Sequence, residues 1–183
     1  HGSKDGGKTI EVQGDLNLSA QNRIVMPRRL EVHGDFNISD SQITALPSSF
    51  WVMGDFDASN TAIRTVPQDA NIRGSIALRN CRLHEPLPFI DIYGDLDLSG
   101  CYLPGLLQGL RVHGSLNLYR AHIKCLPPDM VVDEALYLID SSVEALPPNL
   151  HVRKNIIAPQ SLLATCGSRS APAIRHACTR ERR

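Results

Sequence analysis

The chain has 183 residues, enough for one domain with a well-buried core, and aromatic residues make up only 5% of it, so we expect aliphatic side chains to fill that core. Lys and Arg together number 19, as do Asp and Glu, and this zero net charge gives no reason to expect nucleic acid or an anionic membrane as a partner. No uninterrupted apolar run approaches the roughly 18 residues of a membrane span, so we expect none.

The first nine residues differ in composition from the rest of the chain. His-Gly-Ser-Lys-Asp-Gly-Gly-Lys resembles a cloning tag followed by a flexible lead, and we set residues 1–9 apart from the fold on that ground. The five cysteines form no CxxC pair and no His-spaced ligand set. An odd, scattered set of cysteines favours a reducing compartment over a disulfide framework.

A period of twenty residues runs from residue 10 to residue 158. Glycine recurs at that spacing, and the positions four before, two before, two after and four after it are apolar in every repeat. The glycines are Gly14, Gly34, Gly54, Gly74, Gly94 and Gly114. The column two before them reads Val12, Val32, Val52, Ile72, Ile92, Val112, Val132 and Val152. The column four before them includes Ile10, Leu30, Phe50, Ala70, Ile90, Leu110, Met130 and Leu150.

The alternation of apolar and polar residues within each repeat predicts extended strands. A recurring Leu-Pro pair, and the little length left in each unit, argue against a helix. Glycine inside an extended stretch indicates a tight corner where backbones pack closely. Stacked coils would pair neighbouring strands about 4.8 Å apart and bury one apolar column per position. The sequence therefore predicts a mainly β repeat solenoid of about seven to eight coils over 10–158, with parallel sheets and little helix.

These columns resemble the leucine-rich-repeat family, whose core pattern is LxxLxLxxN/CxL. In the third unit Phe56 and Ala58 take the strand positions, Thr61 the asparagine position and Ile63 the next apolar one. In the asparagine column, small hydroxyl and thiol residues take five of the seven positions, in the series Gln21, Ser41, Thr61, Cys81, Cys101, Ala121 and Ser141.

The repeat length and the Leu-Pro pairs look most like the short repeats of bacterial type III secreted effectors, although the middle of the unit reads LxVxGDL instead of their LxxLxVxxN. That resemblance implies a protein-binding module, in the bacterial cytoplasm or secreted into a host cell. The alternative it implies is the substrate-recognition domain of a larger effector enzyme, such as a ubiquitin ligase. The residues after 158 are too few for its catalytic domain.

Three columns of side chains flank the strand residues that follow the glycine and are expected to point outward. The first is Asp15, Asp35, Asp55, Ser75, Asp95, Ser115 and Ala135. The second is Asn17, Asn37, Asp57, Ala77, Asp97, Asn117 and Tyr137. The third is Ser19, Ser39, Ser59, Arg79, Ser99, Tyr119 and Ile139.

The carboxylates of the first two columns have two interpretations. Asp55, Asp57, Asp95 and Asp97 could form an acidic surface for a basic partner, because a column of like charges is destabilising without such a purpose. Alternatively, Asp and Ser both accept a backbone N–H next to a glycine corner, and the columns would then be structural. A calcium site is disfavoured, because no loop supplies six to eight oxygens.

At the C-terminal end of the same columns, Asn117, Tyr119, Tyr137 and Ile139 interrupt the small polar pattern with larger groups. Tyrosine is enriched in interface hot spots. We therefore expect a protein partner to bind the concave sheet there, with Arg79 as a further contact. The alternative is that the segment after 158 covers these side chains.

Other candidates are weaker. A second face could present His33, Trp51, Met53, Arg73, Tyr93 and His113. Cys125, with His122 three residues earlier, could form a nucleophile pair, but a repeat rod offers no evident cleft there. We expect no enzyme activity in this fragment, no metal and no cofactor, and a monomer.

Residues 159–183 lose the repeat and gain charge, with five Arg and one Glu from residue 161 onward. We expect part of this segment to cap the open end of the core and the remainder to be a basic linker leading to a further domain. Without interleaved aromatic residues, these arginines are a weak sign of nucleic-acid binding.

Overall fold

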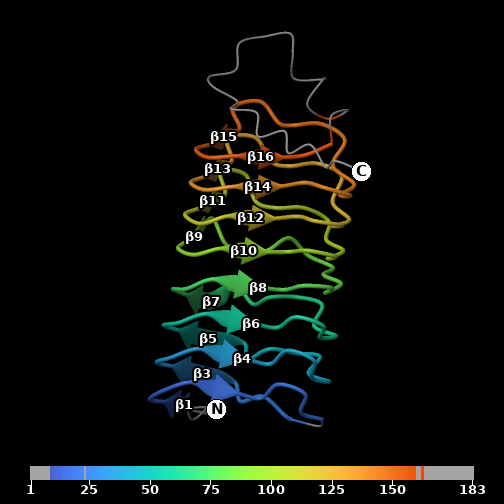
Figure 1. The fold of residues 1–183 in the computed structure, drawn as a ribbon. Coiled ribbons are helices and arrows are strands. Elements are labelled where there is room, and N and C mark those ends of the chain that lie inside the picture. Colours follow the sequence, from blue (N-terminus) through green and yellow to red (C-terminus); the bar gives the residue numbers. More distant parts are fainter. Residues whose placement is uncertain (1–8, 23, 160–161, 163–183) are drawn as a thin grey trace, which may run out of the picture.

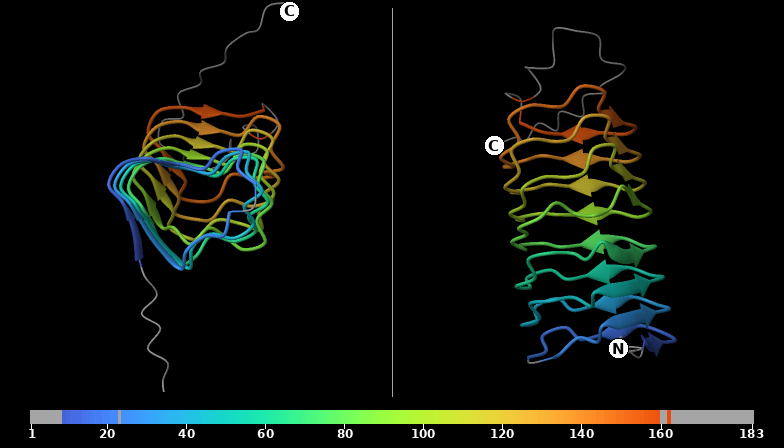
Figure 2. Two further views of the ribbon diagram at one scale, coloured as in Figure 1. Left: turned by 90° about the horizontal axis from the view of Figure 1, so that it is seen from below. Right: turned by 180° about the vertical axis from the view of Figure 1, so that it is seen from behind.

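The computed structural model describes residues 9–22, 24–159 and 162. They form a parallel β-solenoid in which each twenty-residue repeat makes one coil, and the coils stack along a single axis (Figure 1). Seen along that axis, the coils trace closed outlines that lie over one another (Figure 2). The fold class predicted from the sequence is therefore confirmed, including the parallel sheets and the near absence of helix among the described residues.

One sheet runs the whole length of the described solenoid and takes one short strand from each coil, just after the glycine corner. Its strands are β2 (Leu16–Asn17), β4 (Phe36–Asn37), β6 (Phe56–Asp57), β8 (Ile76–Ala77), β10 (Leu96–Asp97), β12 (Leu116–Asn117), β14 (Leu136–Tyr137) and β16 (Ile156–Ile157). Neighbouring strands pair in parallel with a register of twenty residues, as in Leu96 with Leu116. Matching apolar residues therefore lie one above another.

The strands before the glycine form two further sheets instead of one. The first four coils contribute β1 (Thr9–Val12), β3 (Arg29–Val32), β5 (Ser49–Val52) and β7 (Asp69–Ile72). The last four contribute the shorter β9 (Asp91–Ile92), β11 (Arg111–Val112), β13 (Val131–Val132) and β15 (His151–Val152). A third side of each coil is mostly irregular, with isolated parallel bridges that join Arg82 to Tyr102 and Tyr102 to His122.

The break between β7 and β9 has a local cause in the sequence. The fourth repeat places its core leucine one residue late, at Leu87, which is 2% exposed between Pro86 and Pro88. Because side chains alternate along extended backbone, a one-residue slip reverses which of them face inward. Phe89 accordingly packs against the core while Ile90 is 59% exposed. The expectation that every member of the Ile10–Leu150 column is internal is wrong at Ile90 and also at Ile10 in the first coil, which is 49% exposed.

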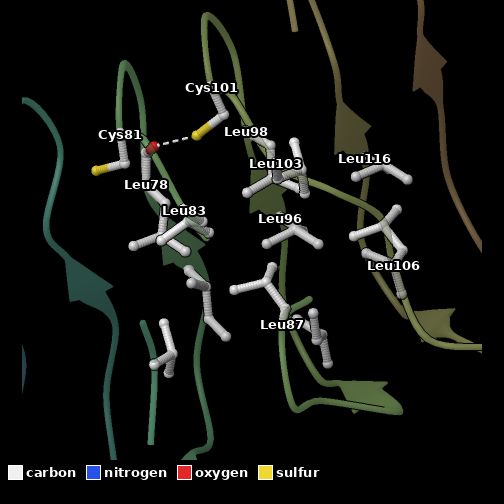
Figure 3. Close-up of a cluster of buried hydrophobic side chains, with 14 of the residues drawn as sticks. Leu78, Cys81, Leu83, Leu87, Leu96, Leu98, Cys101, Leu103, Leu106 and Leu116 are labelled. Atoms are coloured by element: carbon white, nitrogen blue, oxygen red, sulfur yellow. Dashed lines mark hydrogen bonds between the residues drawn. The ribbon is translucent and has the colours of Figure 1, made fainter. Parts of the chain in front are cut away.

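The core is a continuous stack of aliphatic side chains, with one aromatic group near the N-terminal end. Phe36, Phe50 and Phe56 pack edge-on or tilted, with ring centroids 5.4 to 6.3 Å apart. Further along the stack, leucines from successive coils fill the interior of the solenoid (Figure 3). Leu162 is 6% exposed and belongs to the same cluster, so at least this residue of the 159–183 segment packs on the core.

The glycine column is a tight corner, as the sequence predicts. A Cβ on Gly54 would overlap the Asp35 carboxylate and lie 2.8 Å from the carbonyl carbon of Gly34 in the preceding coil. The backbones themselves touch here, because Gly54 N–H donates to Gly34 O at 3.0 Å and Gly74 N–H to Gly54 O at 3.0 Å. Glycine allows this approach without a clash, and in the last two coils, where Glu134 and Lys154 take the position, the equivalent bonds are 3.2 and 3.1 Å long.

A second corner follows the long sheet and requires a left-handed backbone. The positions at this corner are Ala20 (φ 55°), Asp40 (57°), Asn60 (58°), Asn80 (56°), Gly100 (66°), Arg120 (54°) and Asp140 (57°). Asn, Asp and Gly tolerate this conformation best. Asn60 and Asn80 also form a short amide ladder, in which Asn80 Nδ2 donates to Asn60 Oδ1 at 2.8 Å.

Candidate functional site

The first outward column serves the fold. In each coil from the first to the fifth, the Asp or Ser side chain after the glycine accepts the backbone N–H of the equivalent residue in the next coil, at 2.6 to 3.1 Å. Asp55 accepts from Ser75 N–H and Asp95 from Ser115 N–H. The same carboxylates fill the space that each following glycine leaves open. The structural interpretation of this column is therefore the one that the geometry supports.

The second column has a different local role. Asn17, Asn37, Asp57, Asp97 and Asn117 each accept the backbone N–H of the residue two positions later, at 2.8 to 3.0 Å. Such side-chain turns stabilise the exit from each short strand of the long sheet. Two of the sequence-predicted contact residues, Asp57 and Asp97, are thus already hydrogen-bonded within their own coil.

Arg79 is also held in place by the column beside it. Its Nη2 lies 3.3 Å from Asp57 Oδ2, and its Nε donates to Ser59 Oγ at 3.1 Å. The Arg79 side chain remains half exposed. It is therefore oriented by the fold, and it lies two coils away from Tyr119 and three from Ile139.

Those larger side chains meet on adjacent coils at the C-terminal end of the long sheet. We call Asn117, Tyr119, Tyr137 and Ile139 the tyrosine surface. Asn117 pairs with Tyr137 across β12 and β14, and Arg120 N–H donates to Ile139 O at 3.0 Å, so the two coils are in register throughout. Tyr119, Tyr137 and Ile139 are 37%, 40% and 42% exposed. The structure brings together all four residues that the sequence singled out here.

One neighbour of this surface was missed by sequence reasoning. The guanidinium of Arg120 lies 4.9 Å from the centroid of the Tyr119 ring, within the range of a cation–π contact. Its Nε is also 3.6 Å from Asp140 Oδ2. The repeat pattern gave no reason to select Arg120, because position 120 belongs to a corner column whose other members are small or polar. The adjacency of Tyr119 and Arg120 in sequence was the available signal.

The second candidate face divides into two parts. Trp51 and Met53 stand exposed on β5 and just after it. In the last four coils, Tyr93 stacks on His113 with ring centroids 5.7 Å apart and an interplanar angle of 4°. The same His113 contacts Asp91 at 2.9 Å and Asp133 at 3.1 Å.

Asp133 is the centre of an ion-pair cluster on that face. It lies 3.1 Å from Arg111 and 3.0 Å from Arg153, and its side chain is only 12% exposed. Burial alone would raise the pKa of the carboxyl, but the hydrogen bond from Arg111 and the charges of Arg111, Arg153 and His113 outweigh it. The pKa of Asp133 therefore lies below its ordinary value. This cluster joins three successive coils of the second face.

The described thiols divide by exposure. Cys101 donates to Leu78 O at 2.6 Å inside the core, and burial raises its pKa to about 12 (Figure 3). Cys81 is buried beside Thr61, and burial raises its pKa as well. Thr61 Oγ1 donates to Ala58 O at 2.7 Å. The column of Thr61, Cys81 and Cys101 therefore donates hydrogen bonds to backbone carbonyls of its own and of neighbouring coils. A thiol of raised pKa is a poor nucleophile, and these two residues are structural.

Cys125 is exposed, but the geometry around it does not resemble a catalytic pair. The ring of His122 packs on Tyr102, with centroids 5.6 Å apart, and among the described residues no hydrogen bond joins it to Cys125. Within the same part of the chain, no cluster of three or more His, Cys, Asp or Glu side chains has the arrangement needed to hold a metal ion. Nor does a helix there have the length and apolarity required to cross a membrane.

Together these features define a parallel β-solenoid with an exposed aromatic surface near one end of its longest sheet. No protein-family model matches the chain. No curated protein matches it either, and neither does any solved structure.

Proposed function

We propose that this protein is a binding module for another protein and that the tyrosine surface is its contact site. The observation that carries the proposal is the grouping of Tyr119, Tyr137 and Ile139, all more than a third exposed, on two directly paired coils. Tyrosine supplies a large contact area at low entropic cost, and apolar neighbours exclude water from its contacts. Arg120, held over the Tyr119 ring, adds a second residue type that is enriched in hot spots.

The other long-sheet residues support this choice of location. Asp55, Asp57, Asp95 and Asp97 are hydrogen-bonded to the backbone, so the fold explains their presence without a partner. Within the tyrosine surface Asn117 shares this role, because it accepts the N–H of Tyr119 at 3.0 Å. The Tyr137 side chain makes no such hydrogen bond among the described residues, and the Ile139 side chain has no polar atom to make one. The acidic columns would then border the contact on its N-terminal side.

The origin of the protein is a further part of the proposal. The twenty-residue unit and the recurring Leu-Pro pairs resemble leucine-rich repeats of bacterial secreted effectors, and we carry that resemblance forward as the proposed class. The buried free thiols Cys81 and Cys101 support a reducing compartment. The recognition domain of a larger effector enzyme is one form that such a module can take.

Site-specific photo-crosslinking tests the location directly. A photoreactive phenylalanine analogue at position 137 should yield a crosslinked partner from lysates, whereas the same analogue at position 102 or 93, both exposed tyrosines on other faces, should not. Replacing Tyr119 and Tyr137 with Ala should weaken binding of the purified partner at least about 30-fold, the effect of losing ~2 kcal/mol at a hot spot. Tyr102→Ala is the matched control, and equal binding by both variants would exclude the tyrosine surface.

A further inference from the structure

The third side of the solenoid carries a hollow that brings together three basic side chains, a hydroxyl and two apolar side chains. A cavity of about 410 Å³ is bounded by Thr44, Ala62, Ile63, Arg64, Arg82 and His84. Thr44, Arg64 and His84 occupy the same position in three successive coils, and Ala62 and Arg82 share another. The small Ala62, between Gln42 and Arg82 in its column, leaves the space, and Ile63 closes its floor against the core.

Among the described residues, the cations of this hollow form no ion pair. The ion pairs among the described residues involve only the cations His33, Arg79, Arg111, His113, Arg120, Arg153 and Lys154, which all lie elsewhere. Arg64 and Arg82 form none, even though Glu85 follows His84 in the chain. The backbones of neighbouring coils lie about 4.8 Å apart along the stack, and like charges on adjacent coils repel one another. An anion between them would remove that repulsion.

One of the two arginines is oriented before any ligand arrives. The Arg82 guanidinium lies 5.2 Å from the centroid of the Tyr102 ring, which in turn packs on His122. Parallel bridges fix the backbone of these three residues, and His84 N–H donates to Arg64 O at 2.8 Å. A guanidinium that is held in place loses less entropy when it forms hydrogen bonds.

We propose that this hollow binds a tetrahedral oxyanion, a phosphate or sulfate group. In this site Arg64 and Arg82 donate to the anion, and the Thr44 hydroxyl supplies a further donor. Arginine forks match the oxygen geometry of such groups, and the pairing is charge-assisted. This site lies on a different side of the coil from the tyrosine surface, and its occupancy does not depend on the function proposed for that surface.

The test is an NMR titration of the full chain with inorganic phosphate, with sulfate and with chloride, at constant ionic strength. Saturable shifts at Arg64, Arg82, Thr44 and His84 with phosphate or sulfate, but not with chloride, are expected, and the stronger of the two anions identifies the group. Equal effects of chloride, or shifts spread over all basic residues, would overturn the proposal. This readout uses the unaltered protein and needs no variant to fold.

A variant pair gives a second readout. Replacing both Arg64 and Arg82 with Gln should weaken binding by at least tenfold, because each charge-assisted hydrogen bond contributes to affinity on that scale. Arg73→Gln is the matched control, since Arg73 is an exposed arginine without an ion pair on another face. A loss of similar size in the control would show general charge attraction and contradict a built site.

Discussion

Substituting Gly54 with Ala tests the close approach of the coils. The added Cβ would displace the Asp35 carboxylate from its hydrogen bond with Asp55 N–H, which is now 2.8 Å long. It would also lie 2.8 and 2.9 Å from the Gly34 carbonyl carbon and oxygen, so the two coils must separate. The lost hydrogen bond and the overpacking each cost on the order of 1–3 kcal/mol, and we expect a total of about 3 kcal/mol.

Thermal and urea unfolding followed by circular dichroism measure this cost. For a chain of this length, ~3 kcal/mol corresponds to a fall of about 6–12 °C in Tm. Gly14→Ala is the matched control, because Gly14 holds the same column position but a Cβ there meets nothing within 4 Å. The reasoning is refuted if Gly54→Ala is as stable as Gly14→Ala.

Three further substitutions or reactions probe other parts of the fold. Ala20→Gly should stabilise the protein by up to about 1 kcal/mol in urea unfolding, because Ala20 has a φ of 55°; a loss of stability would contradict strain at that corner. At pH values above 3.8, the ordinary pKa of Asp, Asp133→Asn should lower the urea midpoint of unfolding. The difference from the unaltered protein should disappear as the pH falls through the lowered pKa that Asp133 has in the folded state. A midpoint difference that persists at about pH 2 would contradict it. With the cysteines beyond residue 162 replaced by serine, a thiol reagent should modify Cys125 in the folded protein and reach Cys101 only on unfolding.

The sequence predicts the fold well because each physical requirement recurs every twenty residues. A buried column such as Val32, Val52 and Ile72 is hard to recognise in a single repeat, but it is plain when eight repeats are aligned. The glycine corner follows from the same repetition. The prediction that Ile90 is buried is wrong because it follows from the twenty-residue spacing alone. The one-residue shift at Leu87 changes which side chains of that coil face inward.

The candidate sites were less predictable. Tyr119 and Tyr137 stood out because they break a polar pattern, and the structure places them together. The hollow around Arg64 and Arg82 gave no signal, since it depends on the short side chain of Ala62 between longer neighbours and on residues from three coils. The sequence also left open whether the aspartate columns were surface charge or structural acceptors. Distances to the next coil decide this for Asp15, Asp35, Asp55 and Asp95.

Every proposal above depends on residues twenty apart being direct neighbours. Methyl-labelled NMR tests this most directly, through nuclear Overhauser contacts within the buried column of Val32, Val52 and Ile72. The structure predicts strong contacts between Val32 and Val52 and between Val52 and Ile72, and much weaker ones between Val32 and Ile72, two coils apart. Absence of the first two contacts in a folded protein would contradict the stacked solenoid and every surface derived from it.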